Sequence, residues 1–291
     1  MKEITILSGK GGAGKTTVAA AFASVAKNAV FCDNDVDAAD LHLIFNPEIK
    51  ETYTFGSGSK AEINPDECTN CGLCSDYCRF DAIHPNSFGQ FEVNHFQCEG
   101  CRLCQRVCPT ESIAMVENNN NYWYVSETRF GTLVYAKMGP GEENSGKLVT
   151  EVRRKTKEIA FETKADYIIN DGPPGIGCSA IASVTGTDAV LLVIEPTLSG
   201  LHDAARLFEL VDTFKIPVYA VINKFDINPE ITSQVENYLA EKQIPLAGKI
   251  PFDTNMVESM VEEKTIVEFG PNEKISREFY SIWDKIALNV I

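Results

Sequence analysis

The stretch Ser8-Gly9-Lys10-Gly11-Gly12-Ala13-Gly14-Lys15-Thr16-Thr17 lies near the start of the 291-residue chain, directly after the apolar run Ile4–Leu7. Gly9 and Gly14 enclose four residues and precede Lys15 and Thr16, which completes the phosphate-loop pattern G-x-x-x-x-G-K-[ST]. Glycines let successive backbone N–H groups face phosphate oxygens, and a helix that starts near Lys15 directs its positive end to the same place. We therefore predict a nucleotide site with Lys15 on the β- and γ-phosphates and Thr16 on Mg²⁺; a glycine-rich turn without a ligand is the alternative.

Lys10 is a second lysine that an ordinary phosphate loop does not need. With it, the loop resembles the K-G-G-x-G-K-T-T loop of the MinD/ParA/nitrogenase-iron-protein group of P-loop ATPases. The resemblance implies that Lys10 reaches across a dimer to the partner subunit's nucleotide, in an ATP-dependent homodimer or a heterodimer with a related ATPase. It also implies that the phosphates are bound by Gly9, Gly11, Gly12, Ala13, Gly14, Lys15, Thr16 and Thr17. A solvated loop lysine is the alternative for Lys10.

Acidic residues follow two further apolar runs. Val30–Cys32 leads into Asp33, Asp35 and Asp37, as expected at the carboxyl edge of a parallel sheet. By the resemblance, Asp35 orients or activates the attacking water and Asp33 helps to hold the metal shell. Capping of the following helix, expected over 38–45, is the alternative and the one we favour for Asp37.

The run Tyr167–Asn170 ends in Asp171-Gly172-Pro173-Pro174-Gly175, which has the D-x-P-P-G form of the same family. This resemblance makes Asp171 the Walker-B carboxylate for Mg²⁺, makes 172–177 the switch loop, and places Pro174 at the nucleotide. A plain turn is the alternative.

The next strand-like segment, 217–222, ends in Asn223-Lys224-Phe225-Asp226. This N-K-x-D sequence resembles the base-recognition motif of GTPases, in which the aspartate pairs with guanine, whereas in the MinD-like family the asparagine contacts adenine. We therefore expect Asn223 and Asp226 to lie at the base, and we favour ATP while keeping GTP open.

Eight of the ten cysteines form two copies of C-x₂-C-x₂-C-x₃-C, thirty residues apart from Cys68 to Cys98. This is the spacing of bacterial two-cluster ferredoxins, in which the fourth cysteine of each copy ligates the other cluster. One [4Fe–4S] cluster is therefore predicted on Cys68, Cys71, Cys74 and Cys108, and the other on Cys98, Cys101, Cys104 and Cys78. Arg79 replaces the usual proline after the first copy, and a pair of zinc sites is the alternative. His84 and His95 are expected to be surface or packing residues rather than metal ligands.

The repeat defines the domain organisation. Gly56-Ser57-Gly58-Ser59 resembles a flexible connector, and Asn118–Asn121 marks the end of the repeat. We predict an inserted ferredoxin-like α+β domain over 62–118 and a discontinuous MinD-like ATPase domain over 1–61 and 119–291. The ATPase domain is expected to be α/β, with a mostly parallel sheet and helices on both faces.

Composition limits the partners. The net charge of −15 disfavours nucleic acid and anionic membranes, and no signal peptide or long apolar span is present, so we expect a cytoplasmic protein. Ile275, Phe279, Ile282 and Ile286 share one helical face, which we expect to pack in the core rather than on a membrane. Cys32 and Cys178 are both expected to be buried and free, with transient metal handling the alternative for Cys178. Ser145 or Asn144 is expected to cap the helix over 148–162.

Three functions fit these motifs. The favoured one is an ATPase in which dimer closure is coupled to electron transfer through two [4Fe–4S] clusters, with an electron-transfer protein as partner. The second is a maturation ATPase that delivers metal clusters to an accepting protein. The third is a positioning ATPase of the partitioning type with a redox-sensing insert.

Overall fold

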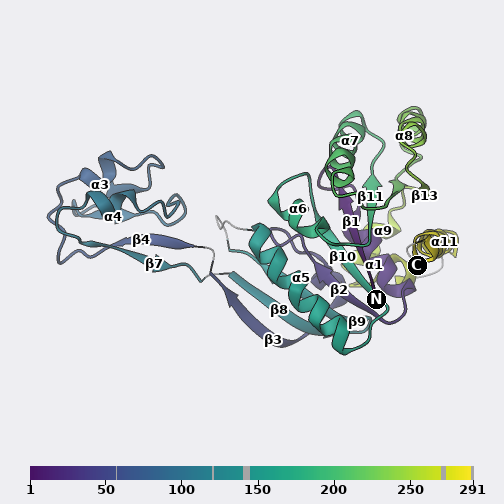
Figure 1. Ribbon diagram of the computed structural model, residues 1–291, viewed down its shortest axis with the longest axis horizontal. Helices are drawn as coiled ribbons and strands as arrows, with labels where there is room; N and C mark the ends of the chain where they lie inside the picture. The colour runs from purple at the N-terminus through teal and green to yellow at the C-terminus, as the bar shows by residue number, and fades with distance from the viewer. Residues whose placement is uncertain (57, 120, 140–144, 270–272, 290–291) are drawn as a thin grey trace. The chain divides into compact units, whose positions relative to one another are not determined.

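The structure is a computed structural model that describes the chain except for residues 57, 120, 140–144, 270–272 and 290–291 (Figure 1). It divides into two compact units. The larger comprises Met1–Thr52, Trp123–Lys137 and Ser145–Ile291, and the smaller comprises Tyr53–Tyr122 and Met138–Asn144. The smaller unit extends beyond the expected 62–118 at both ends.

The larger unit is built on a nine-stranded sheet of order β13-β12-β11-β1-β10-β2-β9-β8-β3. Every pairing from β13 through β9 is parallel, with Ile6 opposite Asp171 and Asp171 opposite Asp33 in register. The carboxyl ends of β1, β2 and β10 therefore meet at one edge. The strands are β1 (Lys2–Ser8), β2 (Ala29–Asp33), β3 (Glu48–Phe55), β8 (Asn121–Thr128), β9 (Gly131–Lys137), β10 (Tyr167–Pro174), β11 (Ala189–Ile194), β12 (Val218–Asn223) and β13 (Leu246–Ile250).

Helices cover both faces of this sheet, because buried parallel strands carry apolar side chains on alternate sides. In β11, Leu191 and Val193 pack into the core under α1 and α11, whereas Leu192 and Ile194 pack into the core under α7 and α8. The helices are α1 (Lys15–Val25), α2 (Leu41–Phe45), α5 (Ser145–Glu162), α6 (Cys178–Val184), α7 (Leu198–Asp212), α8 (Pro229–Glu241), α9 (Asn255–Val261), α10 (Ile266–Phe269) and α11 (Glu273–Asn289).

The smaller unit contains two antiparallel hairpin-like sheets and two short helices. β4 (Ser59–Ile63) pairs with β7 (Ile113–Glu117), and β5 (Ile83–Pro85) pairs with β6 (Phe91–Val93). The helices α3 (Leu73–Asp76) and α4 (Leu103–Val107) each lie inside one cysteine run. The small core of this unit includes Ala61, Ile83 and Ile113 together with the cysteines.

Several local expectations are tested by these elements. The apolar face of α11 is buried, with Phe279 fully inaccessible, so the prediction of core packing is confirmed. No helix in the described ranges is long and apolar enough to cross a membrane. Before the predicted connector, 48–55 forms the edge strand β3, which the sequence analysis did not predict.

Candidate functional site

The phosphate loop joins β1 to α1 and is held in one shape by close packing. Gly14 has φ 97° and precedes the first residue of α1, a left-handed conformation that favours glycine. A Cβ on Gly14 would stand 2.3 Å from Asn223 Nδ2, and one on Gly9 would stand 2.5 Å from the Asp203 backbone. The two glycines that define the sequence motif are therefore required by the fold.

A cavity at the carboxyl edge of the sheet opens in front of this loop, and we call it the phosphate-side cavity. It brings together the loop, the acidic segment after β2 and the two prolines at the end of β10. Its lining comprises Gly11, Gly12, Gly14, Lys15, Thr16, Thr17, Asp35, Asp37, Ala38, Asp40, Pro173, Pro174, Ser179 and Met260. Most residues predicted for phosphate binding thus share one cavity with Asp35 and Pro174.

Asp171 lies behind the cavity and is buried, with 1% of its surface exposed. Neither carboxylate oxygen has a hydrogen-bond partner among the described residues. Burial raises the pKa of Asp171 to about 7 against the opposing effects of the Lys15 ammonium and the Thr16 hydroxyl. Thr16 is near enough to lower this pKa, although it does not complete a hydrogen bond of ordinary geometry. A buried carboxylate with free lone pairs beside Thr16 is chemically suited to a divalent cation.

Asp35 faces the cavity, whereas Asp33 does not. Burial raises the pKa of Asp35 to about 6, opposed by Lys15. Asp33 is fully buried, and its oxygens accept hydrogen bonds from the backbone N–H groups of Asp35, Asp40 and Leu41. The expected part of Asp33 in the metal shell finds no support in this geometry, since its side chain holds the turn instead.

The helix after this turn begins at Leu41 with Asp40 at the N-cap position, so the expected cap at Asp37 is wrong. Asp37 instead lines the phosphate-side cavity.

Lys10 is held by an acidic residue that the sequence analysis did not single out. Its Nζ lies 2.8 Å from Glu195 Oε2 and donates to Thr197 Oγ1 at 3.1 Å. Glu195 Oε1 also accepts from Lys224 Nζ at 2.9 Å. Despite partial burial, the two lysines lower the pKa of Glu195. The sequence offered one signal for Glu195: it directly follows the strand β11, just as Asp33 and Asp171 come at the ends of apolar runs.

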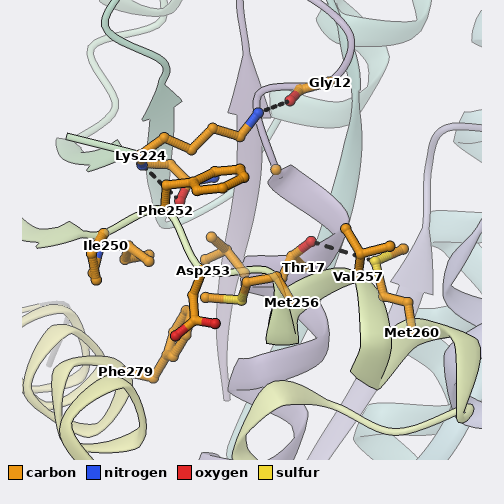
Figure 2. A pocket seen from close by; sticks show the side chains of 14 residues that line it. Gly12, Thr17, Lys224, Ile250, Phe252, Asp253, Met256, Val257, Met260 and Phe279 are labelled. Atoms are coloured by element: carbon orange, nitrogen blue, oxygen red, sulfur yellow. Dashed lines mark hydrogen bonds between the residues drawn. The ribbon is translucent and has the colours of Figure 1, made fainter. Parts of the chain in front are cut away.

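A second cavity, the apolar cavity, also borders the phosphate loop (Figure 2) and shares Gly12, Gly14, Thr17 and Met260 with the phosphate-side cavity. Its apolar lining includes Phe252, Met256, Val257, Met260 and Phe279, and Pro251 and Asp253 line it next to Phe252. Figure 2 shows Lys224 pointing toward the Gly12 carbonyl, to which its Nζ donates at 3.2 Å. Sequence reasoning missed the segment after β13, because it carries no motif.

The N-K-x-D residues also make hydrogen bonds within the protein. Asn223 lines the apolar cavity, but its Nδ2 donates to Ala13 O at 2.9 Å and its Oδ1 accepts from Lys224 N at 3.0 Å. Asp226 is exposed, does not line the cavity, and accepts from Phe252 N at 2.7 Å. The expectation of Asp226 at the base is therefore not supported. The two residues instead fasten the phosphate loop and the Phe252 loop to the end of β12.

In the smaller unit, the eight cysteines of the repeat line two cavities, four in each. One is lined by Cys68, Cys71, Cys74 and Cys108, and the other by Cys78, Cys98, Cys101 and Cys104. We call these the first and second cysteine cavities. The last cysteine of each run thus faces the cavity of the other run. Within the ranges that the structure describes, no group of three or more His, Cys, Asp or Glu side chains is placed to hold a single metal ion.

Hydrogen bonds reach several of these sulfurs. Asn70 N donates to Cys68 Sγ and Ala82 N to Cys78 Sγ, each at 3.4 Å. Cys108 Sγ lies 3.3 Å from Ser112 Oγ; partial burial opposes ionisation, yet the Ser112 and Thr110 hydroxyls lower the pKa of Cys108 to about 7. Such contacts stabilise thiolates, the form that ligates metals.

The two remaining cysteines differ in exposure, and two histidines near the cysteine repeat are exposed. Cys32 is fully buried as expected, and burial raises its pKa to about 12. Cys178 is exposed at the first residue of α6, directly after the N-cap Gly177, so its expected burial is wrong. His84 and His95 are exposed. α5 begins at Ser145, so the expected helix start at 148 was late, and Asn144 lies outside the described residues.

Comparison with known proteins identifies the class. The CobQ/CobB/MinD/ParA nucleotide binding domain matches residues 4–266, and the chain belongs to this family of P-loop ATPases. The uncharacterized protein MJ0578 of Methanocaldococcus jannaschii is 32% identical over 98% of this chain and 96% of its own length. The septum site-determining protein MinD of Synechocystis is 24% identical over 91% of this chain and 81% of its own length.

Solved structures share the fold at low identity. MinD of Pyrococcus horikoshii complexed with Mg-ADP is 20% identical, with a TM-score of 0.58 over 100% of this chain and 98% of that one. Apo McdA of Cyanothece is 16% identical, with a TM-score of 0.60 over 98% and 99% of the two chains. These similarities show an α/β P-loop fold with a mostly parallel sheet, as predicted.

Proposed function

We propose that the protein binds and hydrolyses MgATP, and that nucleotide-driven dimer closure is coupled to electron transfer through two [4Fe–4S] clusters held by the smaller unit. The observation that carries this proposal is the placement of the eight cysteines around two cavities, each completed by a cysteine of the other run. That crossed arrangement is the one expected for two-cluster ferredoxins.

Iron–sulfur ligation is compatible with the lack of a single-ion site among the described residues. A single ion needs donors that converge on one point at about 2.3 Å for thiolates. A cubane cluster is wider than an ion, so its four thiolates stand around a cavity. The N–H and O–H donors to Cys68, Cys78 and Cys108 are of the kind that tune the potentials of such clusters.

For the nucleotide, the phosphate-side cavity supports triphosphate binding by the loop, with Lys15 and Thr16 on the phosphates and Mg²⁺. Asp171 has the buried, unpartnered oxygens that a hydrated Mg²⁺ would satisfy. Asp35 is the residue in the cavity best placed to orient water. The apolar cavity next to Asn223 is suited to a purine, and because Asp226 is bonded to Phe252 N, adenine is favoured over guanine.

Dimer closure rests on Lys10, which in the single chain is bound to Glu195 and Thr197. A role at a partner's nucleotide requires Lys10 to exchange these contacts for phosphate oxygens. Sedimentation with MgATP tests this step: wild-type protein is expected to dimerise and Lys10→Ala to remain monomeric. Dimerisation of the Lys10→Ala variant at the wild-type ATP concentration would contradict it.

Coupling is tested by anaerobic purification followed by redox titration with and without MgATP, with iron measured on the same sample. Two clusters whose potentials move with nucleotide support the proposal. Colourless protein without iron, or potentials indifferent to MgATP, would overturn it.

A cluster-carrying ATPase is the second candidate, and the exposure of Cys71 and Cys101 favours it. Exposed thiolate ligands make a cluster accessible to an acceptor. Iron that passes from the protein to an apo-ferredoxin during incubation with MgATP would support this candidate over the first.

A further inference from the structure

The start of the smaller unit contacts the loop of the second cysteine cavity. Lys60, in β4, donates from Nζ to Cys98 O at 2.7 Å. Next to it, Ser59 O lies 2.2 Å from where a Cβ on Gly100 would stand, and Gly100 has φ 61°. The loop from Cys98 to Cys101 is thus pressed against β4, and only glycine fits at its centre.

Lys60 brings an unneutralised positive charge to this loop. The unit has four basic residues between Tyr53 and Tyr122, namely Lys60, Arg79, Arg102 and Arg106. Among the ion pairs of the described residues, none includes Lys60. The Lys60 side chain is half-buried behind the Cys98–Cys101 loop and does not itself line the second cavity. The two charged residues that line this cavity, Glu99 and Arg102, are exposed and of opposite sign.

The first cysteine cavity has a different environment. Its sulfurs receive neutral donors, the Asn70 N–H and the hydroxyls of Ser112 and Thr110. No Lys or Arg lines it. The effect of a fixed unit charge falls off more slowly with distance than that of a dipole, and it is larger in a partly buried site than in water. The two cavities are therefore electrostatically unequal.

We propose that Lys60 is a positioning residue that raises the reduction potential of the cluster held by Cys78, Cys98, Cys101 and Cys104. This inference rests on the iron–sulfur part of the proposed function. Reduction adds one electron from an external donor, and hence one negative charge, to the cluster. A nearby ammonium stabilises that charge, so the second cluster accepts the electron at a less reducing potential than it would without Lys60.

The test is a dithionite titration of the full-length holoprotein followed by electron paramagnetic resonance. Lys60→Met keeps the length of the side chain and removes its charge. We expect the equilibrium constant for reduction of one cluster to fall by about tenfold, which lowers its reduction potential by about 59 mV for one electron. The potential of the other cluster should change much less. Cys108→Ser, which changes a ligand of the first cluster only, identifies which signal belongs to which cluster.

Matched variants separate charge from structure. Lys60→Arg keeps the charge and should leave both midpoints near the wild-type values, and Lys60→Gln keeps an N–H donor but should behave like Lys60→Met. Unchanged midpoints in Lys60→Met with full iron content, or equal shifts of both clusters, would overturn the inference. Loss of iron in both neutral variants but not in Lys60→Arg would also count against tuning and assign Lys60 to cluster assembly. If wild-type protein binds no iron, the proposed function itself fails.

Discussion

Asn223 offers a direct test of how the nucleotide site is built. Its side chain makes one hydrogen bond to Ala13 O in the phosphate loop and one to Lys224 N, and only 8% of the residue is exposed. Each such bond contributes about 1 kcal/mol, so Asn223→Ala should lower the free energy of unfolding by about 2 kcal/mol. Only the Ala13 bond acts on the loop, and its loss should weaken phosphate binding by about fivefold.

The assay is calorimetric titration with MgATP, MgGTP and magnesium tripolyphosphate, alongside urea unfolding of the apo-protein. If Asn223 braces the loop, all three ligands should lose affinity by a similar factor, because all three use the phosphate loop. A loss for MgATP with no change for tripolyphosphate would refute this reasoning and restore Asn223 as a base contact. Asn228→Ala is the matched control: Asn228 caps α8 through Ile231 N, so its loss should lower stability by about 1 kcal/mol without changing nucleotide affinity.

Three further predictions concern other parts of the molecule. The pKa of Asp35 is raised from 3.8 to about 6, so the free energy of unfolding of the apo-protein falls as the pH rises through that value. In urea unfolding, Asp35→Asn should therefore raise the free energy of unfolding by no more than about 2 kcal/mol at pH 8 and leave it unchanged at pH 4. Equal effects at both pH values would contradict this. Cys78→Ala should halve the bound iron in anaerobically purified protein by removing a ligand of one cluster only, whereas unchanged iron would argue against Cys78 as a cluster ligand. Phe279→Ala should lower the free energy of unfolding by about 3–5 kcal/mol in chemical denaturation, because Phe279 is fully buried between α11 and the sheet; an effect under 1 kcal/mol would show that α11 is not part of the core.

The parallel core of the sheet was predictable, because its strands are apolar runs that end in functional residues. β11 is buried at every position, and the phosphate loop follows β1 directly. β3 was not predictable in the same way. Its residues are mostly exposed, with no alternation of buried and exposed side chains, since it forms the edge of the sheet. An edge strand with two solvated faces gives no periodic signal.

In the candidate site, too, some residues could be predicted from the sequence and others could not. Residues inside a short motif, such as Lys15 and Asp171, could be located from local spacing because one turn of chain holds them. Phe252 could not, since it reaches the apolar cavity only through the order of strands in the sheet. Glu195 carried only the signal that it directly follows β11, and its contact with Lys10 depends on the same strand order. The prediction that Cys178 is buried was wrong for a related reason: its exposure depends on how the turn leaves β10, which the local sequence does not specify.

The N-K-x-D segment shows how much of a motif's role depends on parts of the chain outside the motif. In the structure its asparagine and lysine bond to Ala13 and Gly12, while its aspartate bonds to Phe252 N. Asp226 could meet a base only if its carboxylate left that N–H, at a net cost of about 1 kcal/mol for the hydrogen bond lost between these two exposed residues. The motif therefore marks the end of β12, whereas the hydrogen-bond partner of Asp226 comes from the loop after β13. Selectivity for adenine should accordingly follow substitutions in the Phe252 loop rather than substitutions of Asp226 that preserve its acceptor, such as Asp226→Asn.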